Sequence, residues 1–180
     1  MKMDFLLQST LKISALTLAI AATSACTAMA TGAEAQPVTA NAQMMANANS
    51  TAITLGNSAM SSGTNDTVAI GNMANAGLNS ATAVGGQANA AGLGSTSIGW
   101  QSKATAERAQ AFGHLANASG VRSTAVGEAA MAGGTNDTVA VGNKANAGLN
   151  SATAVGGEAN AAGLGSTSIG WQSKATAERA

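Results

Sequence analysis

Few side chains in this sequence of 180 residues could take part in chemistry, and they are widely separated. His114 is the only histidine, and the single cysteine, Cys26, lies near the N-terminus. Nucleophilic catalysis needs a serine, a histidine and a carboxylate within reach of one another, and no spacing here indicates such a group. A metal site needs several clustered ligands, which His114 lacks. We therefore predict no enzyme activity, no catalytic residue, no metal site and no cofactor.

Asp66 and Asp137 are acidic residues in a recurring context, each in a Gly-Thr-Asn-Asp segment. A calcium loop would place several carboxylates close together. Asn and Asp also stabilise tight turns through their own side chains, and this interpretation is favoured because each segment adds one residue to an otherwise regular spacing.

Trp100 and Trp171 each follow an aliphatic-Gly pair, and His114 follows a Phe-Gly pair. An exposed tryptophan often contributes strongly to binding. A large ring could instead cover a junction between subunits, and we favour packing for the two tryptophans and surface decoration for His114. All three remain candidate ligand contacts. The glycines form no phosphate loop, because no Gly-Lys-Ser/Thr follows them.

The element that must position these residues is a short repeat. An aliphatic or aromatic residue, here called the anchor, precedes a glycine nine times at a nearly constant spacing, and only two of the steps are longer than the others, by one residue each. Such a period indicates a solenoid. The anchors are Leu55, Ile70, Val84, Ile98, Phe112, Val126, Val141, Val155 and Ile169. The structural turn glycines are Gly56, Gly71, Gly85, Gly99, Gly113, Gly127, Gly142, Gly156 and Gly170.

Each repeat carries a small–polar–small pattern after its glycine, as in Ala116-Asn117-Ala118, and a second alternation before it. A period of two is the strand period, so we predict two short strands per repeat, joined at the glycine. Lys103 at a middle position indicates that this face meets water and that the flanking alanines face inward. Helix is disfavoured, because every repeat contains glycine and the alanine spacing is two.

Stacked repeats would place matched asparagines such as Asn75 and Asn89 one above the other. These residues either form hydrogen-bonded ladders or merely tolerate a turn-rich surface, and the sequence leaves both interpretations open.

Composition excludes several classes of protein. Charged residues make up 9% of the chain and balance to zero, so no basic patch for nucleic acid is present.

Each repeat offers one anchor and a few alanines as its core. Burying one aliphatic side chain contributes about 2–3 kcal/mol, whereas ordering each residue costs roughly 1 kcal/mol or more. The predicted core is therefore thin, and we expect identical chains to pack side by side.

The first 35 residues have the pattern of a secretory signal peptide. Lys2 and Lys12 precede the apolar run 13–22, and small-x-small cleavage sites end at Ala30 and Ala35. Cys26 resembles a lipoprotein site weakly, and we favour an incidental cysteine in a segment that is removed. We predict a signal peptide at 1–35, a leader at 36–44 and the repeat domain at 45–180.

A second level of repetition lies on top of the first. Residues 63–109 recur as 134–180 with only three differences, which are Ile70/Val141, Met73/Lys144 and Gln87/Glu158. Solenoids tolerate such a duplication because each unit contacts only its neighbours. The second copy ends inside a repeat, and we expect the chain to be part of a longer protein.

The unit Ser-Thr-Ala-Val-Gly-x-x-Ala-x-Ala at 123–132, repeated in register, resembles the head repeats of trimeric autotransporter adhesins of the YadA-like family. The resemblance covers about residues 45–180. It implies an all-β, left-handed parallel β-roll and a homotrimer displayed on the outer membrane of a Gram-negative bacterium. It also implies a stalk and a C-terminal anchor, which we expect to lie beyond these residues in a longer protein, and no fixed motif of binding residues.

The leading hypothesis is a non-enzymatic, multivalent adhesin that binds host matrix or neighbouring cells. The alternative is an ice-binding or purely structural surface solenoid, indicated by threonines two residues before the anchor. Val68, Gln110 and Val139 interrupt that row, and no second row runs beside it.

Overall fold

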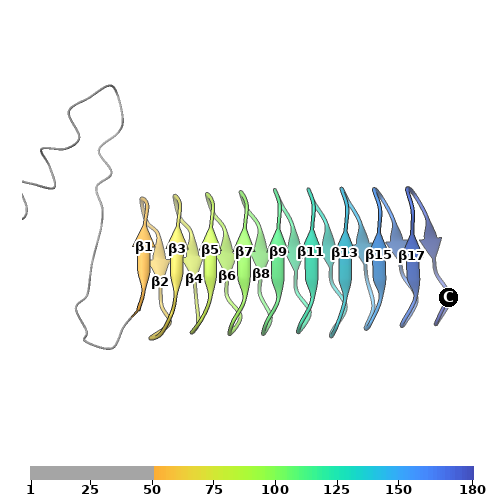
Figure 1. Cartoon of the computed structure of the whole chain (residues 1–180), viewed down its shortest axis with the longest axis horizontal. Coiled ribbons are helices and arrows are strands. Elements are labelled where there is room, and N and C mark those ends of the chain that lie inside the picture. The colour runs from red at the N-terminus through yellow and green to blue at the C-terminus, as the bar shows by residue number, and fades with distance from the viewer. Residues whose placement is uncertain (1–50) are drawn as a thin grey trace, which may run out of the picture. The chain divides into compact units, whose positions relative to one another are not determined.

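The computed structural model describes residues 51–180, which form a parallel β-solenoid of nine rungs with two short strands in each (Figure 1). A rung here means one turn of the solenoid, which is one sequence repeat. No helix occurs within residues 51–180. The predicted signal peptide at 1–35, the leader at 36–44 and the start of the repeat domain near residue 45 lie outside the described residues.

The strands that carry the anchors form one nine-stranded parallel sheet, sheet A. In sheet order it contains β1 (Ile53–Leu55), β3 (Val68–Ile70), β5 (Thr82–Val84), β7 (Thr96–Ile98), β9 (Gln110–Phe112), β11 (Thr124–Val126), β13 (Val139–Val141), β15 (Thr153–Val155) and β17 (Thr167–Ile169).

The strands that follow the turn glycines form sheet B, which is also parallel and nine-stranded. In sheet order it contains β18 (Lys174–Ala175), β16 (Asn160–Ala161), β14 (Asn146–Ala147), β12 (Met131–Ala132), β10 (Asn117–Ala118), β8 (Lys103–Ala104), β6 (Asn89–Ala90), β4 (Asn75–Ala76) and β2 (Met60–Ser61).

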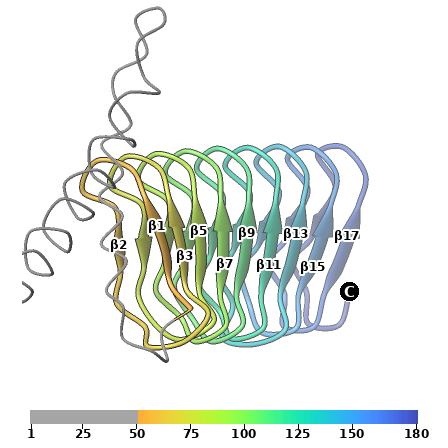
Figure 2. The ribbon, with the colours of Figure 1, turned by 60° about the vertical axis from the view of Figure 1, so that its left-hand side comes forward.

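Figure 2 shows the two sheets lying against each other, with a loop closing each rung at either edge. Pairing is in register along the whole solenoid, so that Val84 pairs with Ile98 and Ile98 with Phe112. The two longer steps keep this register, since Val68 pairs with Ile53 and Val139 with Thr124. Their extra residue is therefore absorbed in a loop rather than in a strand.

The interior between the sheets contains only small side chains. Every buried hydrophobic residue within the described part is an alanine, and the largest fully buried side chains are Thr67 and Thr138. The prediction that the alanines flanking the polar middle position face inward is confirmed: Ala116 and Ala118 are fully buried on either side of Asn117. The close approach of two sheets leaves no room for a larger residue.

The expectation that the anchors supply this core is wrong. In β7, Ser97 is fully buried, whereas Ile98 is 38% exposed. Strand side chains alternate between faces, so a small inward residue before the anchor forces the anchor outward. Sheet A therefore presents its anchors, and the residues two positions earlier, on the outer surface of the roll.

The turn glycine is required by backbone geometry, as Gly99 illustrates. Its φ is +131°, and a Cβ there would lie 2.4 Å from the carbonyl oxygen of Gly113 in the next rung. The Gly99 amide donates to the carbonyl of Val84, 2.8 Å away in the preceding rung. Glycine is thus needed both for its left-handed φ and for the close stacking of successive turns.

The matched asparagines form hydrogen bonds between some rungs and not between others. Asn75 donates from Nδ2 to Oδ1 of Asn89 at 3.1 Å, and Asn146 donates to Asn160 at 3.2 Å. Elsewhere Lys103, Met131 or another residue interrupts the column. The ladders are therefore pairs rather than a continuous array.

Candidate functional site

The candidate site is the row of side chains immediately after the turn glycines, here called the ridge. Its members, in rung order, are Asn57, Asn72, Gly86, Trp100, His114, Glu128, Asn143, Gly157 and Trp171. Hydrogen bonds between rungs fix the row, because each following amide donates to the ridge carbonyl one rung earlier, as Leu115 does to Trp100 at 3.0 Å. Successive ridge side chains are therefore neighbours in space although they lie one whole repeat apart in sequence.

Four consecutive ridge residues form a continuous chain of contacts. The rings of Trp100 and His114 are stacked, with centroids 5.0 Å apart and planes inclined by 28°. His114 Nδ1 lies 3.6 Å from Glu128 Oε1, and Asn143 donates from Nδ2 to Glu128 Oε2 at 3.3 Å. All four groups come from different rungs, so the arrangement depends on the register of the solenoid.

A second row, one residue further along, flanks the ridge. Gln101 donates from Nε2 to Oε1 of Gln87 at 2.9 Å, beside Trp100. Gln172 donates from Nε2 to Oε2 of Glu158 at the same distance, beside Trp171. The duplication thus places a pair of polar planar side chains next to each indole.

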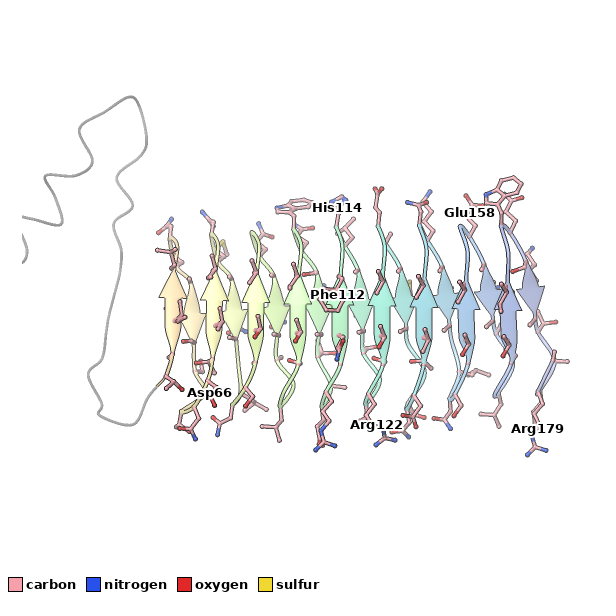
Figure 3. All side chains as sticks on the ribbon, viewed as in Figure 1. Asp66, Phe112, His114, Arg122, Glu158 and Arg179 are labelled. Atoms are coloured by element: carbon pink, nitrogen blue, oxygen red, sulfur yellow. The ribbon has the colours of Figure 1, made fainter. Side chains whose placement is uncertain are left out.

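The edge of the roll opposite the ridge carries a second group of charged side chains, which includes Asp66, Arg122 and Arg179. Figure 3 shows His114 and Glu158 at one edge, Asp66, Arg122 and Arg179 at the other, and Phe112 on the face of the strands between them. The ridge is therefore separate from the surface made by the anchors.

The two aspartates of the longer loops occupy equivalent positions, with φ of 51° at Asp66 and 52° at Asp137. The Asp66 amide donates to Thr51 Oγ1 at 2.8 Å, and its carboxylate accepts a hydrogen bond from the same hydroxyl. Arg122 donates from Nε and Nη2 to the two carboxylate oxygens of Asp137, at 2.7 and 2.8 Å.

These hydrogen bonds from Arg122, assisted by its charge, hold the pKa of Asp137 below its ordinary value. The same contact raises the pKa of Arg122. Both side chains are about half exposed, so the pair is a surface ion pair rather than a buried functional group.

The ridge side chains contact one another mainly at the surface of the roll. Within residues 51–180, no three or more His, Cys, Asp or Glu side chains gather as metal ligands would. His114 contacts a ring and one carboxylate, and both its ring and Glu128 are substantially exposed.

The threonines two positions before the anchors lie on the outer face of sheet A, in register. Val68, Gln110 and Val139 interrupt this row in the strand pairings, as they do in the sequence. A flat, regular array of threonines is thus not formed.

Sequence reasoning located part of the ridge. The structure brings His114 onto Trp100 and leaves Trp171 five rungs away on the same row. Glu128 and Asn143 were not predicted to be partners of His114, although Glu128 lies one rung after His114 and Asn143 one rung after Glu128. The outward anchor surface was also missed. That His114, Trp100 and Trp171 contact a ligand stays a prediction.

Comparison with known proteins supports the same repeat. A family model described as the YadA head domain repeat matches residues 79–102, 90–116, 104–130, 118–145 and 161–180. No curated protein matches the chain significantly. In the part of the chain that the structure describes, no helix is long and apolar enough to cross a membrane.

The first four matches advance by about one rung each and the fifth begins about three rungs further on, which agrees with the in-register strands of the structure. YadA head repeats occur in adhesins of the bacterial cell surface. With its nine rungs and its matches between residues 79 and 180, the chain belongs to the YadA head domain repeat family.

Proposed function

We propose that this chain is the head of a trimeric autotransporter adhesin: a non-enzymatic homotrimer of left-handed β-rolls that binds host matrix or neighbouring cells at the surface of a Gram-negative bacterium. The family supports an adhesin. The left-handed winding is proposed from the family resemblance alone, and the trimer and the ligand class rest on the arguments that follow.

The observation that carries the proposal is the apolar outer face of sheet A. Its nine anchors run along the roll in register, and Ile98 and Ile169 are 38% and 69% exposed. A soluble protein rarely leaves so long a row of aliphatic side chains uncovered. Six of the nine anchors are less exposed than Ile98, so covering the exposed part of an anchor contributes less than about 1 kcal/mol in most rungs, repeated along the roll.

A second and a third copy of the chain are the natural occupants of this face. The interior of one roll contains only alanine, serine and threonine, so one chain alone buries little apolar surface. Three rolls packed through their anchor faces would enclose a larger core of Val, Ile, Leu and Phe. Phe112, half-buried in the single chain, would lie in that shared core.

The ridge would remain accessible in such a trimer, because it follows the edge of the roll rather than the anchor face (Figure 3). Three ridges would then run along one head. Repetition of a weak site in this way raises the apparent affinity for a surface by orders of magnitude.

The remaining element is export. We propose that residues 1–35 direct secretion and that the mature head is displayed at the outer membrane. Cys26 then belongs to the removed segment, and disulfides play no part in the mature head.

Sedimentation equilibrium on the full chain tests the assembly. We expect three times the chain mass of 17.3 kDa, less any cleaved segment. Ile98→Asp, which places a charge on the anchor face, should give a smaller species, whereas Met131→Asp, at a 48% exposed position of sheet B, should not. A stable folded monomer of the unmodified chain would contradict the proposal.

Adhesion is tested separately by coating beads with the full chain and measuring their retention on collagen, on fibronectin and on cultured cells. Retention above that of uncoated beads on at least one surface is expected. Trimers that are retained on none of them would leave the assembly standing and contradict the adhesin function.

A further inference from the structure

We propose that two patches on the ridge bind neutral pyranose sugars of a single linear polysaccharide. The first tryptophan patch consists of Gly86, Gln87, Trp100 and Gln101. The second tryptophan patch consists of Gly157, Glu158, Trp171 and Gln172. This inference rests on the proposed adhesin function and names its ligand class.

The two indoles are the largest side chains of the ridge. Trp100 is open to solvent with rungs on both sides of it, and Trp171 occupies the equivalent place in the last rung. Trp100 is 49% exposed and Trp171 is 74% exposed. A pyranose ring has a face of C–H groups and a rim of hydroxyls. The C–H face packs on an aromatic ring, while the rim requires hydrogen-bond donors and acceptors nearby.

The polar partners are already in place beside each ring. The Gln87–Gln101 and Glu158–Gln172 hydrogen bonds, both 2.9 Å long, hold these planar side chains against each other. Each amide keeps a free N–H or oxygen for a ligand. Side chains ordered before binding lose less conformational entropy when a ligand arrives.

A glycine one rung earlier makes space for each indole. A Cβ at Gly86 would lie 3.0 Å from Cδ1 of Trp100, and one at Gly157 would lie 3.2 Å from Cδ1 of Trp171. Neither glycine has a left-handed φ. Glycine is therefore not demanded there by the backbone, and its contribution is the space that the ring occupies.

The charge of the patches favours a neutral ligand. Neither patch contains Lys or Arg. His114 stacks on Trp100 with Glu128 beyond it, and Glu158 belongs to the second patch. The first patch is uncharged, and the second carries the carboxylate of Glu158 with the single cation Lys144 one rung earlier in the same row, so neither patch offers the cluster of cations that a sulfated or phosphorylated sugar would need.

The spacing favours a polymer. Trp100 and Trp171 are five rungs apart on the same row, which at about 4.8 Å per parallel strand is roughly 24 Å. One extended glycan lying along the ridge would reach both patches. Occupying the second patch then becomes an intramolecular step, and the apparent affinity rises.

Tryptophan fluorescence tests the inference directly, because Trp100 and Trp171 are the only tryptophans and the chain has no tyrosine. The full chain is titrated with hexasaccharides of glucose, galactose, mannose and N-acetylglucosamine, and with heparin as the anionic comparison. We expect a saturable shift with at least one neutral hexasaccharide and none with heparin. Trp100→Ala and Trp171→Ala should each leave one responding ring.

The corresponding polysaccharide tests the spacing. Each single tryptophan variant should bind it roughly tenfold more weakly than the unmodified chain, and the double variant should not bind. Gly86→Ala should weaken the first patch while circular dichroism stays unchanged. Met131→Ala, a matched exposed apolar residue on sheet B, should bind normally.

The inference is overturned by a flat titration with all neutral hexasaccharides, by binding of heparin alone, or by equal losses in Met131→Ala. It is also overturned when the tryptophan variants change the sedimenting mass, because the rings would then cover a subunit junction. Normal adhesion of beads coated with the double variant would contradict sugar binding by the two patches and leave the adhesin function intact.

Discussion

Ser97 and Ser102 face each other inside the roll, with their hydroxyl oxygens 2.7 Å apart. Ser97 belongs to β7, and Ser102 immediately precedes β8, so this hydrogen bond joins sheet A to sheet B within one rung. The rung that follows has Ala111 and Ala116 at the same two positions, both fully buried. The same interior therefore accepts either a hydrogen-bonded serine pair or an alanine pair.

This equivalence predicts a strongly non-additive pair of substitutions. Ser102→Ala should destabilise the protein by about 1–3 kcal/mol, because the buried hydroxyl of Ser97 loses its partner. Ser97→Ala should cost less, since Ser102 also donates to the carbonyl of Gly99 at 3.0 Å. The double variant should be close to the unmodified chain.

Urea unfolding followed by circular dichroism gives all four free energies of the cycle. The pair Ala111→Ser and Ala116→Ser is the matched control: both together should be tolerated better than either alone. Additive costs in the first cycle would show that the two hydroxyls are not coupled.

The regular part of the fold could be predicted from the sequence. The spacing of the turn glycines and the alternation of the alanines are local signals. They predict the number of strands, their register and the inward direction of the alanines. The side of the sheet on which Ile98 lies did not follow, because hydrophobicity alone assigned it to the core. Its neighbour Ser97 carried the deciding information, as alternation allows only one of the two inside.

The candidate site was harder to predict for a similar reason. Trp100 and His114 stood out by residue type, whereas Glu128 and Asn143 are ordinary residues whose importance comes from stacking one rung apart. The Arg122–Asp137 pair was missed because the extra residue of its loop shifts the sequence separation to 15. Contacts between rungs are visible in a sequence only after the register is known.

The second prediction concerns the turn glycine. Gly99→Ala should destabilise the protein by about 3 kcal/mol or more, because the new Cβ meets the backbone of Gly113 and the left-handed φ is strained. Gly148→Ala is the control, since no atom lies within 4 Å of the place that its Cβ would take and its φ is not left-handed. In urea unfolding, the free energy of unfolding should fall sharply for the first variant and stay within about 0.5 kcal/mol of the unmodified chain for the second.

The third prediction separates the inner from the outer face with two adjacent residues. Ala125 is fully buried between the sheets, and Val126 points outward from β11. Ala125→Val adds two carbons to a filled interior and should cost about 1–3 kcal/mol or prevent folding. Val126→Ala should leave the fold of one roll intact and weaken association of the chains.

Circular dichroism and sedimentation at several protein concentrations distinguish the two effects. Ala132→Val, at a fully buried position of sheet B, should reproduce the loss of folded signal. Tolerance of valine at Ala125, combined with unfolding by Val126→Ala, would mean that the anchors and not the alanines form the core.

The fourth prediction is a pH dependence from the ion pair across the loop. Because Arg122 lowers the pKa of Asp137 in the folded state, the pair stabilises the protein above the ordinary pKa of 3.8. That stabilisation is lost as the pH falls through the lowered folded value. Arg122, whose own pKa is raised, stays charged throughout this range and adds no dependence of its own.

We therefore expect the urea midpoint of the unmodified chain to fall between about pH 5 and pH 2 by more than that of Asp137→Asn. The difference should shrink in 1 M salt, since both side chains are exposed and screened. Asp66→Asn is the matched control: it alters the equivalent loop but keeps the Arg122–Asp137 pair, so it should retain this part of the dependence. Identical pH profiles for Asp137→Asn and the unmodified chain would show that the ion pair does not stabilise the folded state.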